Sequence, residues 1–88
     1  MASIDEILEY QNLKNRLEEL TKVFEGKAQE ILERKYKPNP EEEFYGVGID
    51  KVYFNFKKNL VTIDYNLQWS YKIKYKTRIM KFKEFCDE

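Results

Sequence analysis

Residues 51–69, KVYFNFKKNLVTIDYNLQW, decide the fold class. Apolar side chains occupy every second position from Val52 to Phe56, and again from Val61 to Leu67. A period of two is typical of β-strands that bury one face of a sheet. Between the two runs lies a Lys-Asn pair, and Asn tolerates the positive φ that a tight turn needs. The stretch therefore predicts an antiparallel β-hairpin.

The same alternation predicts a register for this hairpin. If Phe56 pairs with Val61, all the apolar side chains of both strands fall on one face, which is the condition that fixes register. The predicted cross-strand pairs are Phe56 with Val61, Phe54 with Ile63, and Val52 with Tyr65.

Odd-numbered positions remain mostly apolar or aromatic as far as Ile79. A single strand over 60–79 would be about 65 Å long, too long for a chain of this size. A three-residue loop at 68–70 would reverse the chain and keep the parity; one strongly bent strand is the alternative. In the hairpin arrangement Leu67 pairs with Tyr71, and Ile73 and Tyr75 join the buried face.

The charged partners follow from the same register. Asp64 then lies opposite Lys74, and we expect a cross-strand ion pair between them.

Before the hairpin, the apolar period is that of a helix. From Tyr10 to Phe24 the apolar steps are 3, 4, 3 and 4, which predicts one amphipathic stripe on a helix over 3–37. Ser3 and Glu6 form a capping box at its start, and Pro38 ends it. Gly26 lies inside the helix and would either be tolerated or divide it into two packed pieces.

These elements predict a single α+β domain, in which a long N-terminal amphipathic helix packs on a three-stranded antiparallel sheet (α-β-β-β). The linker is expected at 38–44, the sheet at 45–80, and a short aromatic C-terminal segment at 81–88. In that last segment Phe82 and Phe85, with Met80 before them, should close the core. Cys86 is the single cysteine of the chain, so we expect a reducing compartment, the cytoplasm.

Charge is unevenly distributed although the chain is neutral overall. Residues 1–44 carry 7 basic and 11 acidic side chains, whereas residues 45–88 carry 9 basic and 5 acidic ones. The basic residues alternate along the last predicted strand and should project from one sheet face together with Tyr53 and Asn55. The predicted partner-binding residues are Lys72, Lys74, Lys76, Arg78, Tyr53 and Asn55. A row of cations of this kind either protects a solvated edge strand or docks an anionic partner.

Catalysis is not indicated. The chain has no histidine, so Ser3, Ser70 and Cys86 lack the usual base for nucleophilic chemistry. We expect no enzyme activity, no cofactor and no metal site. Gly46 and Gly48 are too few for a phosphate-binding loop and more readily permit a β-bulge or bend.

The N-terminal stripe indicates self-association. A helix over 3–37 is about 50 Å long, whereas a sheet of seven- to nine-residue strands covers about 25–30 Å. An overhanging stripe of leucines must be covered, and a second copy of the chain is the simplest cover. We expect a homodimer through Leu13, Leu17, Leu20 and Phe24, no signal peptide and no membrane-spanning segment.

The layout resembles small phage and prophage accessory proteins. The resemblance rests on a leading helix, a hairpin of the pattern I-D-x-V-x-F-x-F … N-x-V-x-I-x-Y that begins at Ile49 and ends at Tyr65, and an aromatic tail around Phe82 and Phe85. It implies a small inhibitor that binds a host or defence protein, as anti-CRISPR proteins do. The alternative is a binder of nucleic acid or of an anionic nucleotide. In either case the partner should present an acidic or phosphate-rich surface.

Overall fold

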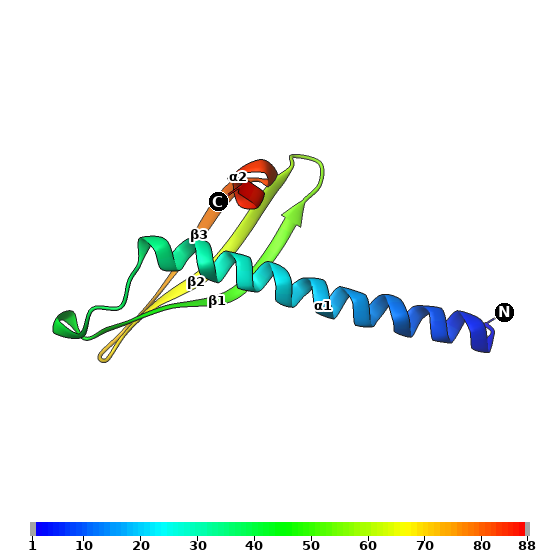
Figure 1. Cartoon of the computed structure of the whole chain (residues 1–88), viewed down its shortest axis with the longest axis horizontal. Coiled ribbons are helices and arrows are strands. Elements are labelled where there is room, and N and C mark those ends of the chain that lie inside the picture. Colours follow the sequence, from blue (N-terminus) through cyan, green and yellow to red (C-terminus); the bar gives the residue numbers. More distant parts are fainter. Residues whose placement is uncertain (1, 88) are drawn as a thin grey trace.

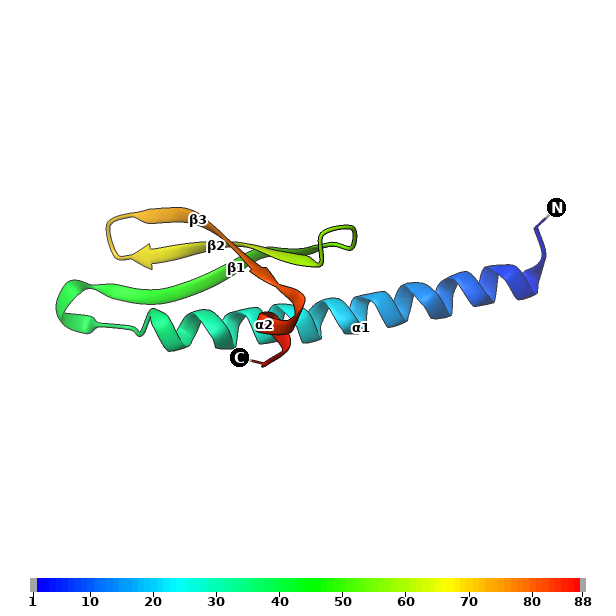
Figure 2. The same ribbon diagram turned by 90° about the horizontal axis from the view of Figure 1, so that it is seen from above.

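The computed structural model describes residues 2–87 and confirms the predicted α+β class (Figure 1). The elements in chain order are α1 (Ile4–Lys35), the 3-10 turn η1 (Pro40–Glu42), β1 (Phe44–Asn55), β2 (Leu60–Trp69), β3 (Ile73–Lys81) and α2 (Phe82–Asp87). The three strands form one antiparallel sheet in the order β1-β2-β3. α1 packs across one face of this sheet, and α2 folds back toward the same side (Figure 2).

The start of α1 is capped as predicted, with one difference in detail. The backbone N–H of Glu6 donates to the Ser3 hydroxyl at 3.2 Å. The Ser3 hydroxyl in turn donates to the Glu6 carboxylate at 3.1 Å, whereas the capping box predicts that this carboxylate reaches the Ser3 backbone. α1 then runs through Gly26 without a break and ends at its C-cap, Tyr36.

Only the C-terminal half of α1 touches the sheet. Every described residue from Ala2 to Glu19 is exposed, and Leu20 is the first that is half-buried. The molecule therefore measures 60 × 28 × 18 Å with a radius of gyration of 17.1 Å, against about 12 Å for a compact domain of this length. The free part of the helix, residues 4–20, is called the overhang below (Figures 1 and 2).

The register of the first hairpin differs from the prediction by two residues. Phe54 pairs with Val61 and Val52 with Ile63, so the predicted pairs are wrong although the shared face is right. The Asn55 side chain accepts hydrogen bonds from the backbone N–H groups of Lys57 and Lys58, both at 3.1 Å. This capping draws Phe56 out of the strand into a four-residue loop, where its side chain is 77% exposed instead of buried.

The second hairpin reverses the predicted faces of β3. Its turn contains two residues, Ser70 and Tyr71, and is closed by the Trp69 N–H donating to the Lys72 carbonyl at 2.8 Å. Leu67 consequently pairs with Lys74, not with Tyr71. An even-numbered loop exchanges inside for outside along the whole following strand.

The consequence is that two predicted core residues lie in solvent. Ile73 is 55% and Tyr75 72% exposed, on the sheet face away from α1. Asp64 pairs with Thr77, whose hydroxyl donates to the Asp64 carboxylate at 2.8 Å, so the predicted ion pair with Lys74 is also wrong.

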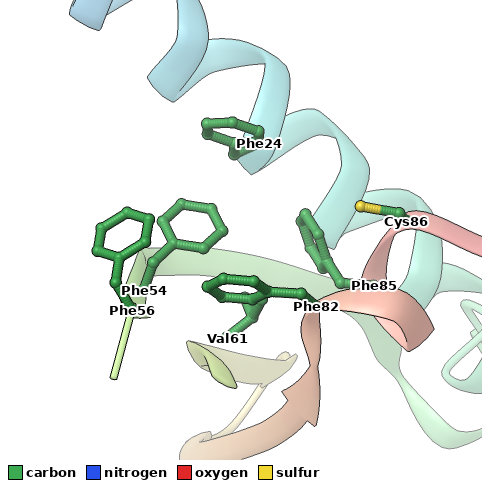
Figure 3. A pocket seen from close by; sticks show the side chains of 7 residues that line it. All are labelled: Phe24, Phe54, Phe56, Val61, Phe82, Phe85 and Cys86. Atoms are coloured by element: carbon green, nitrogen blue, oxygen red, sulfur yellow. The ribbon is translucent and has the colours of Figure 1, made fainter. Parts of the chain in front are cut away.

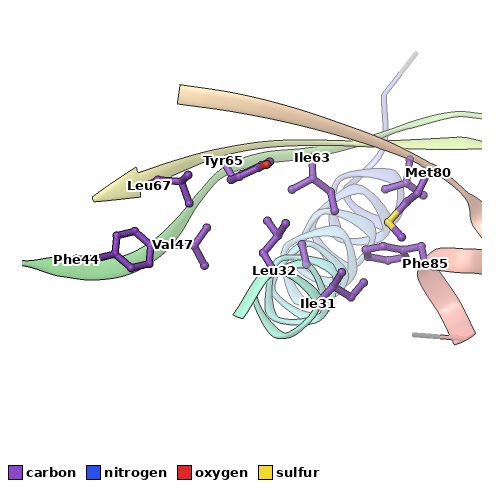
Figure 4. Close-up of a cluster of buried hydrophobic side chains, with 11 residues drawn as sticks. Ile31, Leu32, Phe44, Val47, Ile63, Tyr65, Leu67, Met80 and Phe85 are labelled. Carbon is purple, nitrogen blue, oxygen red and sulfur yellow. The ribbon is translucent and has the colours of Figure 1, made fainter. Parts of the chain in front are cut away.

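The core lies between the C-terminal half of α1, the sheet and α2 (Figure 4). Leu32, Val61 and Ile63 are fully buried. Met80 and Phe85 are each 3% exposed, which confirms that the C-terminal segment closes the core. The buried apolar residues are Ala28, Ile31, Leu32, Phe44, Val47, Val61, Ile63, Tyr65, Leu67, Met80 and Phe85.

Two bulges bend β1. The register shifts between Phe44 and Gly46 and again between Ile49 and Lys51. Gly46 has a φ of 127°, which L-residues rarely adopt, and it adjoins the first bulge as predicted. Gly48 plays a different part, because a Cβ there would lie 2.9 Å from the Gln68 amide nitrogen.

None of the helices within residues 2–87 is both long and apolar enough to cross a lipid bilayer.

Candidate anion-binding site

Four lysines line one hollow beside the C-terminal end of α1. Lys35 is the last residue of the helix, Lys37 follows it in the connecting segment, and Lys74 and Lys76 come from β3. The hollow has a volume of about 370 Å³ and is called the cationic trough here. The remaining lining residues are Tyr36, Asn39, Glu42, Phe44, Leu67 and Trp69.

The two-residue turn at Ser70 creates this arrangement. Because it reverses the parity of β3, Lys74, Lys76 and Arg78 project to the face that α1 covers. The turn is held by Glu43, whose carbonyl accepts from the Ser70 N–H at 3.0 Å and whose carboxylate accepts from the Ser70 hydroxyl at 2.7 Å. A contact across 27 residues of sequence therefore fixes the face on which the lysines lie.

Two arginines extend the positive surface along the helix. Arg34, Lys35 and Arg78 line a neighbouring hollow of about 320 Å³ together with Ile31. The Arg34 guanidinium also pairs with Glu30 at 2.9 Å. Both side chains of that pair are more than half exposed, so the pair contributes little to stability. Arg34 lies close to the trough because its hollow shares Lys35 with the trough.

Aromatic rings contact several lysine ammonium groups in and beside the trough. The Lys72 Nζ lies 4.6 Å from the centroid of the Trp69 ring and 5.5 Å from that of Tyr71. Lys35 and Lys76 lie 5.3 Å and 5.9 Å from the centroid of Tyr36. Cation–π contacts at exposed sites are worth about 0.5–1 kcal/mol. They orient the lysines and leave the ammonium hydrogens able to reach an anion.

A pair of tyrosines connects the trough to the core. The hydroxyls of Tyr36 and Tyr65 lie 3.4 Å apart, within hydrogen-bonding distance. Burial raises the pKa of Tyr65 to about 12, and the contact with Tyr36 acts in the same direction. The pKa of Tyr36 is lowered, first by the hydrogen bond with Tyr65 and then by the positive charges of Lys76 and Lys35.

The predicted partner-binding set is not one surface. Tyr53 and Asn55 lie on the outer face of the sheet, opposite Lys74, Lys76 and Arg78. Asn55 caps the first hairpin. The Tyr53 ring instead contacts Lys51, whose Nζ lies 5.1 Å from the centroid of that ring.

The sequence does not indicate that Lys35 and Lys37 belong to a trough. Their position at the end of the helix predicted over 3–37 is explained by the favourable interaction of cations with the helix dipole. Their proximity to two β3 lysines depends on how α1 crosses the sheet, which periodicity does not report.

The outer face of the sheet is polar at its centre. Asn66 is 8% exposed. Its amide nitrogen donates to Asp50 at 2.9 Å, and its oxygen accepts from Gln68 at 2.7 Å. Gly48 leaves the space that these side chains occupy. The charged member of this network is the Asp50 carboxylate, so the network offers no positive charge to an anionic partner.

The predicted dimer residues do not share one environment. Leu13 and Leu17 are 59% and 65% exposed on the overhang, and Leu20 is half-buried. Phe24 packs against the chain's own core, with its ring centroid 4.8 Å from that of Phe54. The first three residues therefore form the uncovered stripe, and Phe24 marks where the sheet begins to cover it.

Within residues 2–87, no three His, Cys, Asp or Glu side chains are placed to share a metal ion. Cys86 is an exposed free thiol on α2.

No protein-family model, no curated protein and no solved structure matches this chain. The resemblance to phage accessory proteins accordingly stays a prediction.

Proposed function

We propose that this chain is a non-enzymatic interaction protein that binds the acidic surface of a protein partner through the cationic trough. One observation carries the proposal: Lys74 and Lys76 of β3 converge on one hollow with Lys35 and Lys37, which lie at and just after the end of α1. Like charges repel, so their convergence destabilises the isolated chain, and an anionic partner would relieve the repulsion.

The trough suits recognition by charge. Three of its lysines stand on regular structure, since Lys74 and Lys76 lie on β3 and Lys35 is the last residue of α1. Such a surface accelerates encounter by electrostatic steering and selects partners of opposite charge. Glu42 is the acidic residue among those lining the trough, and it leaves a surplus of positive charge.

The layout resemblance is consistent with an inhibitor of the phage type, acting in the cytoplasm by occupying a host or defence protein. A target of this kind would have to present an acidic surface to the lysines of the trough. Binding alone would suffice for inhibition, and the trough provides a binding surface without catalytic groups.

A second candidate is a binder of single-stranded nucleic acid, favoured by the aromatic residues beside the lysines. Tyr71 is 65% exposed and Trp69 is half-buried next to Lys72. Single-strand binders combine a positive groove with rings on which bases stack. Here, however, Lys72 already lies over the Trp69 ring, so a base would have to displace it.

The decisive experiment replaces two lysines of the trough. K74E/K76E should retain the fold, because both side chains lie at an edge strand, and should lose partner binding. K81E/K83E makes the same change in charge at the last residue of β3 and in α2, and should bind normally. The partner is first captured from the native host with the wild-type chain, and affinity is then measured at several salt concentrations. Equal affinity of K74E/K76E and wild type would refute the trough as the binding site.

Oligonucleotides separate the two candidates. A random single-stranded DNA that binds with a steep salt dependence, and that competes with the captured protein, would favour the nucleic-acid alternative. Failure to bind at low salt would leave the protein-binding proposal in place.

We also propose that the chain forms a homodimer through the overhang, with Leu13, Leu17 and Leu20 at the contact. The support is that Leu13 and Leu17 are 59% and 65% exposed and that Leu20 is only half-buried. Sedimentation equilibrium should give a mass near twice 10.8 kDa at micromolar concentration. A mass of 10.8 kDa throughout would refute the dimer.

A further inference from the structure

A second apolar surface lies next to the overhang. Between α1, the tip of the first hairpin and α2 is a hollow of about 230 Å³ (Figure 3). We call it the aromatic hollow; its lining residues are Phe24, Phe54, Phe56, Val61, Phe82, Phe85 and Cys86. Its Phe82 and Phe56 ring centroids lie 5.9 Å apart, and Phe56 is 77% exposed. An isolated domain gains nothing by presenting this ring to water.

The hollow is continuous with the uncovered leucine stripe. A groove of about 430 Å³ runs between α1 and the first hairpin, lined by Leu17 and Leu20 at one end and by Phe54 and Phe56 at the other. Phe24, Phe54 and Phe56 belong to both the groove and the hollow. One apolar path therefore leads from the overhang into the aromatic hollow.

The surface area that the leucine stripe alone could bury is too small for a stable dimer. The 20 residues from Ile4 to Val23 form about 30 Å of a helix about 10 Å across, with a lateral surface of about 900 Å². If one third is apolar stripe, two copies bury about 600 Å², half of the roughly 1,200 Å² that stable interfaces need. The remaining buried area must come from a neighbouring surface. The groove and the aromatic hollow are the apolar surfaces that adjoin the stripe.

The direction of the partner helix follows from the fold. The stripe that is free at Leu17 faces the chain's own sheet from Phe24 onward. A parallel partner lying on the stripe would run into that sheet over its whole C-terminal half. An antiparallel partner brings only its N-terminal turns to this point, where the groove opens.

The N-terminal turns have the side chains that such a position requires. Ile4, Ile7 and Leu8 are 76%, 61% and 51% exposed. At about 100° per residue, Leu8 lies about 180° around the helix from Leu17, so the helix end is apolar on the side away from the stripe as well. A helix end that lies between α1 and the hairpin of the other copy contacts protein on both sides, so it needs apolar side chains on both sides.

Charges agree with the same arrangement. Asp5 and Glu6 stand in the first turn of α1, and Lys57 and Lys58 follow Phe56 in the hairpin loop. Antiparallel packing brings the acidic end of one copy to the basic loop of the other, twice by symmetry. Parallel packing would place the acidic ends together.

Resting on the proposed self-association, we infer that the occupant of the aromatic hollow is a second copy of this chain, whose first helical turns enter it in an antiparallel, two-fold symmetric dimer. The aromatic hollow thus supplies the part of the dimer interface that the leucine stripe lacks. Ile4 and Leu8 of each copy pack against Phe54 and Phe56 of the other.

Two exposed aromatic residues provide a matched test. F56D should raise the dimer dissociation constant at least tenfold in sedimentation equilibrium. Y75D should leave it unchanged, because Tyr75 is 72% exposed on the outer sheet face. Circular dichroism checks that both variants fold. An unchanged dissociation constant for folded F56D would overturn the inference.

The native Cys86 at the rim of the hollow reports the direction. A cysteine at position 2 lies beyond about 30 Å of helix from Phe24, so A2C can reach Cys86 only in a second copy. Mild oxidation of A2C should give disulfide-linked dimers that vanish in A2C/C86S, whereas Y71C, at the opposite end of the sheet, should give few.

Linked dimers that persist in A2C/C86S would mean that the N-termini meet each other and would overturn the antiparallel arrangement. A dimer by mass without a link through Cys86 would exclude the hollow and leave the proposed dimer intact. A monomer by mass would refute the dimer itself.

Discussion

Two leucines on one face of α1 test whether the helix is divided into an anchored and a free half. Leu32 is fully buried under the sheet, and Leu17 is 65% exposed on the overhang. Replacing a buried leucine by alanine costs about 2.7–5 kcal/mol, a large part of the roughly 4–13 kcal/mol expected for 88 residues. L32A should therefore lower the melting temperature by about 12–30 °C.

L17A should cost less than about 1 kcal/mol in the monomer. Leu17 has about a third of its surface covered, which corresponds to about 0.5–1 kcal/mol of the 1.5–3 kcal/mol for full burial, and alanine is the slightly better helix former. The loss should grow with protein concentration, because dimer formation couples to stability, whereas L32A should lose the same amount at every concentration.

The assay is urea unfolding followed by circular dichroism, at about 1 µM and about 100 µM for wild type and both variants. Equal losses for L17A and L32A at the lower concentration would refute the division of α1. They would mean that the overhang packs on its own chain.

Two further predictions concern backbone and pH. G26A should stabilise the chain by about 1 kcal/mol, because Gly26 is helical and a Cβ there meets nothing within 4 Å; destabilisation in urea unfolding would indicate a hinge. Between pH 10 and about 12 the unfolded Tyr65 loses its proton while the folded one keeps it, so stability should fall as pH rises. Y65F should remove that part of the fall, and parallel stability–pH curves for wild type and Y65F would contradict the assigned cause.

Features that depend only on neighbouring residues could be predicted from the sequence. The 3-4 spacing from Tyr10 to Phe24 and the capping by Ser3 produce a helix that begins where predicted. The alternation around Ile63 correctly assigns the buried face of β2. These features follow because helix and strand periods are properties of the local backbone.

A local cap decided the register of the first hairpin, and tertiary structure decided the faces of β3. Asn55 capped a longer loop than the Lys-Asn pair indicated, and Glu43 held a two-residue turn at Ser70. Each contact changes the length of a hairpin loop by a residue or two, and a periodic pattern does not report such a change. In a strand a shift of one residue exchanges the two faces.

The candidate site depends on that exchange. The alternating lysines of β3 were visible in the sequence, but not the face on which they lie or the helical residues that they meet. Lys74 and Lys76 join Lys35 and Lys37 only because the C-terminal end of α1 lies close to the side chains of β3. Charge composition is a property of the chain, whereas the convergence of charges on one hollow is set by non-local contacts, and only the folded molecule contains them.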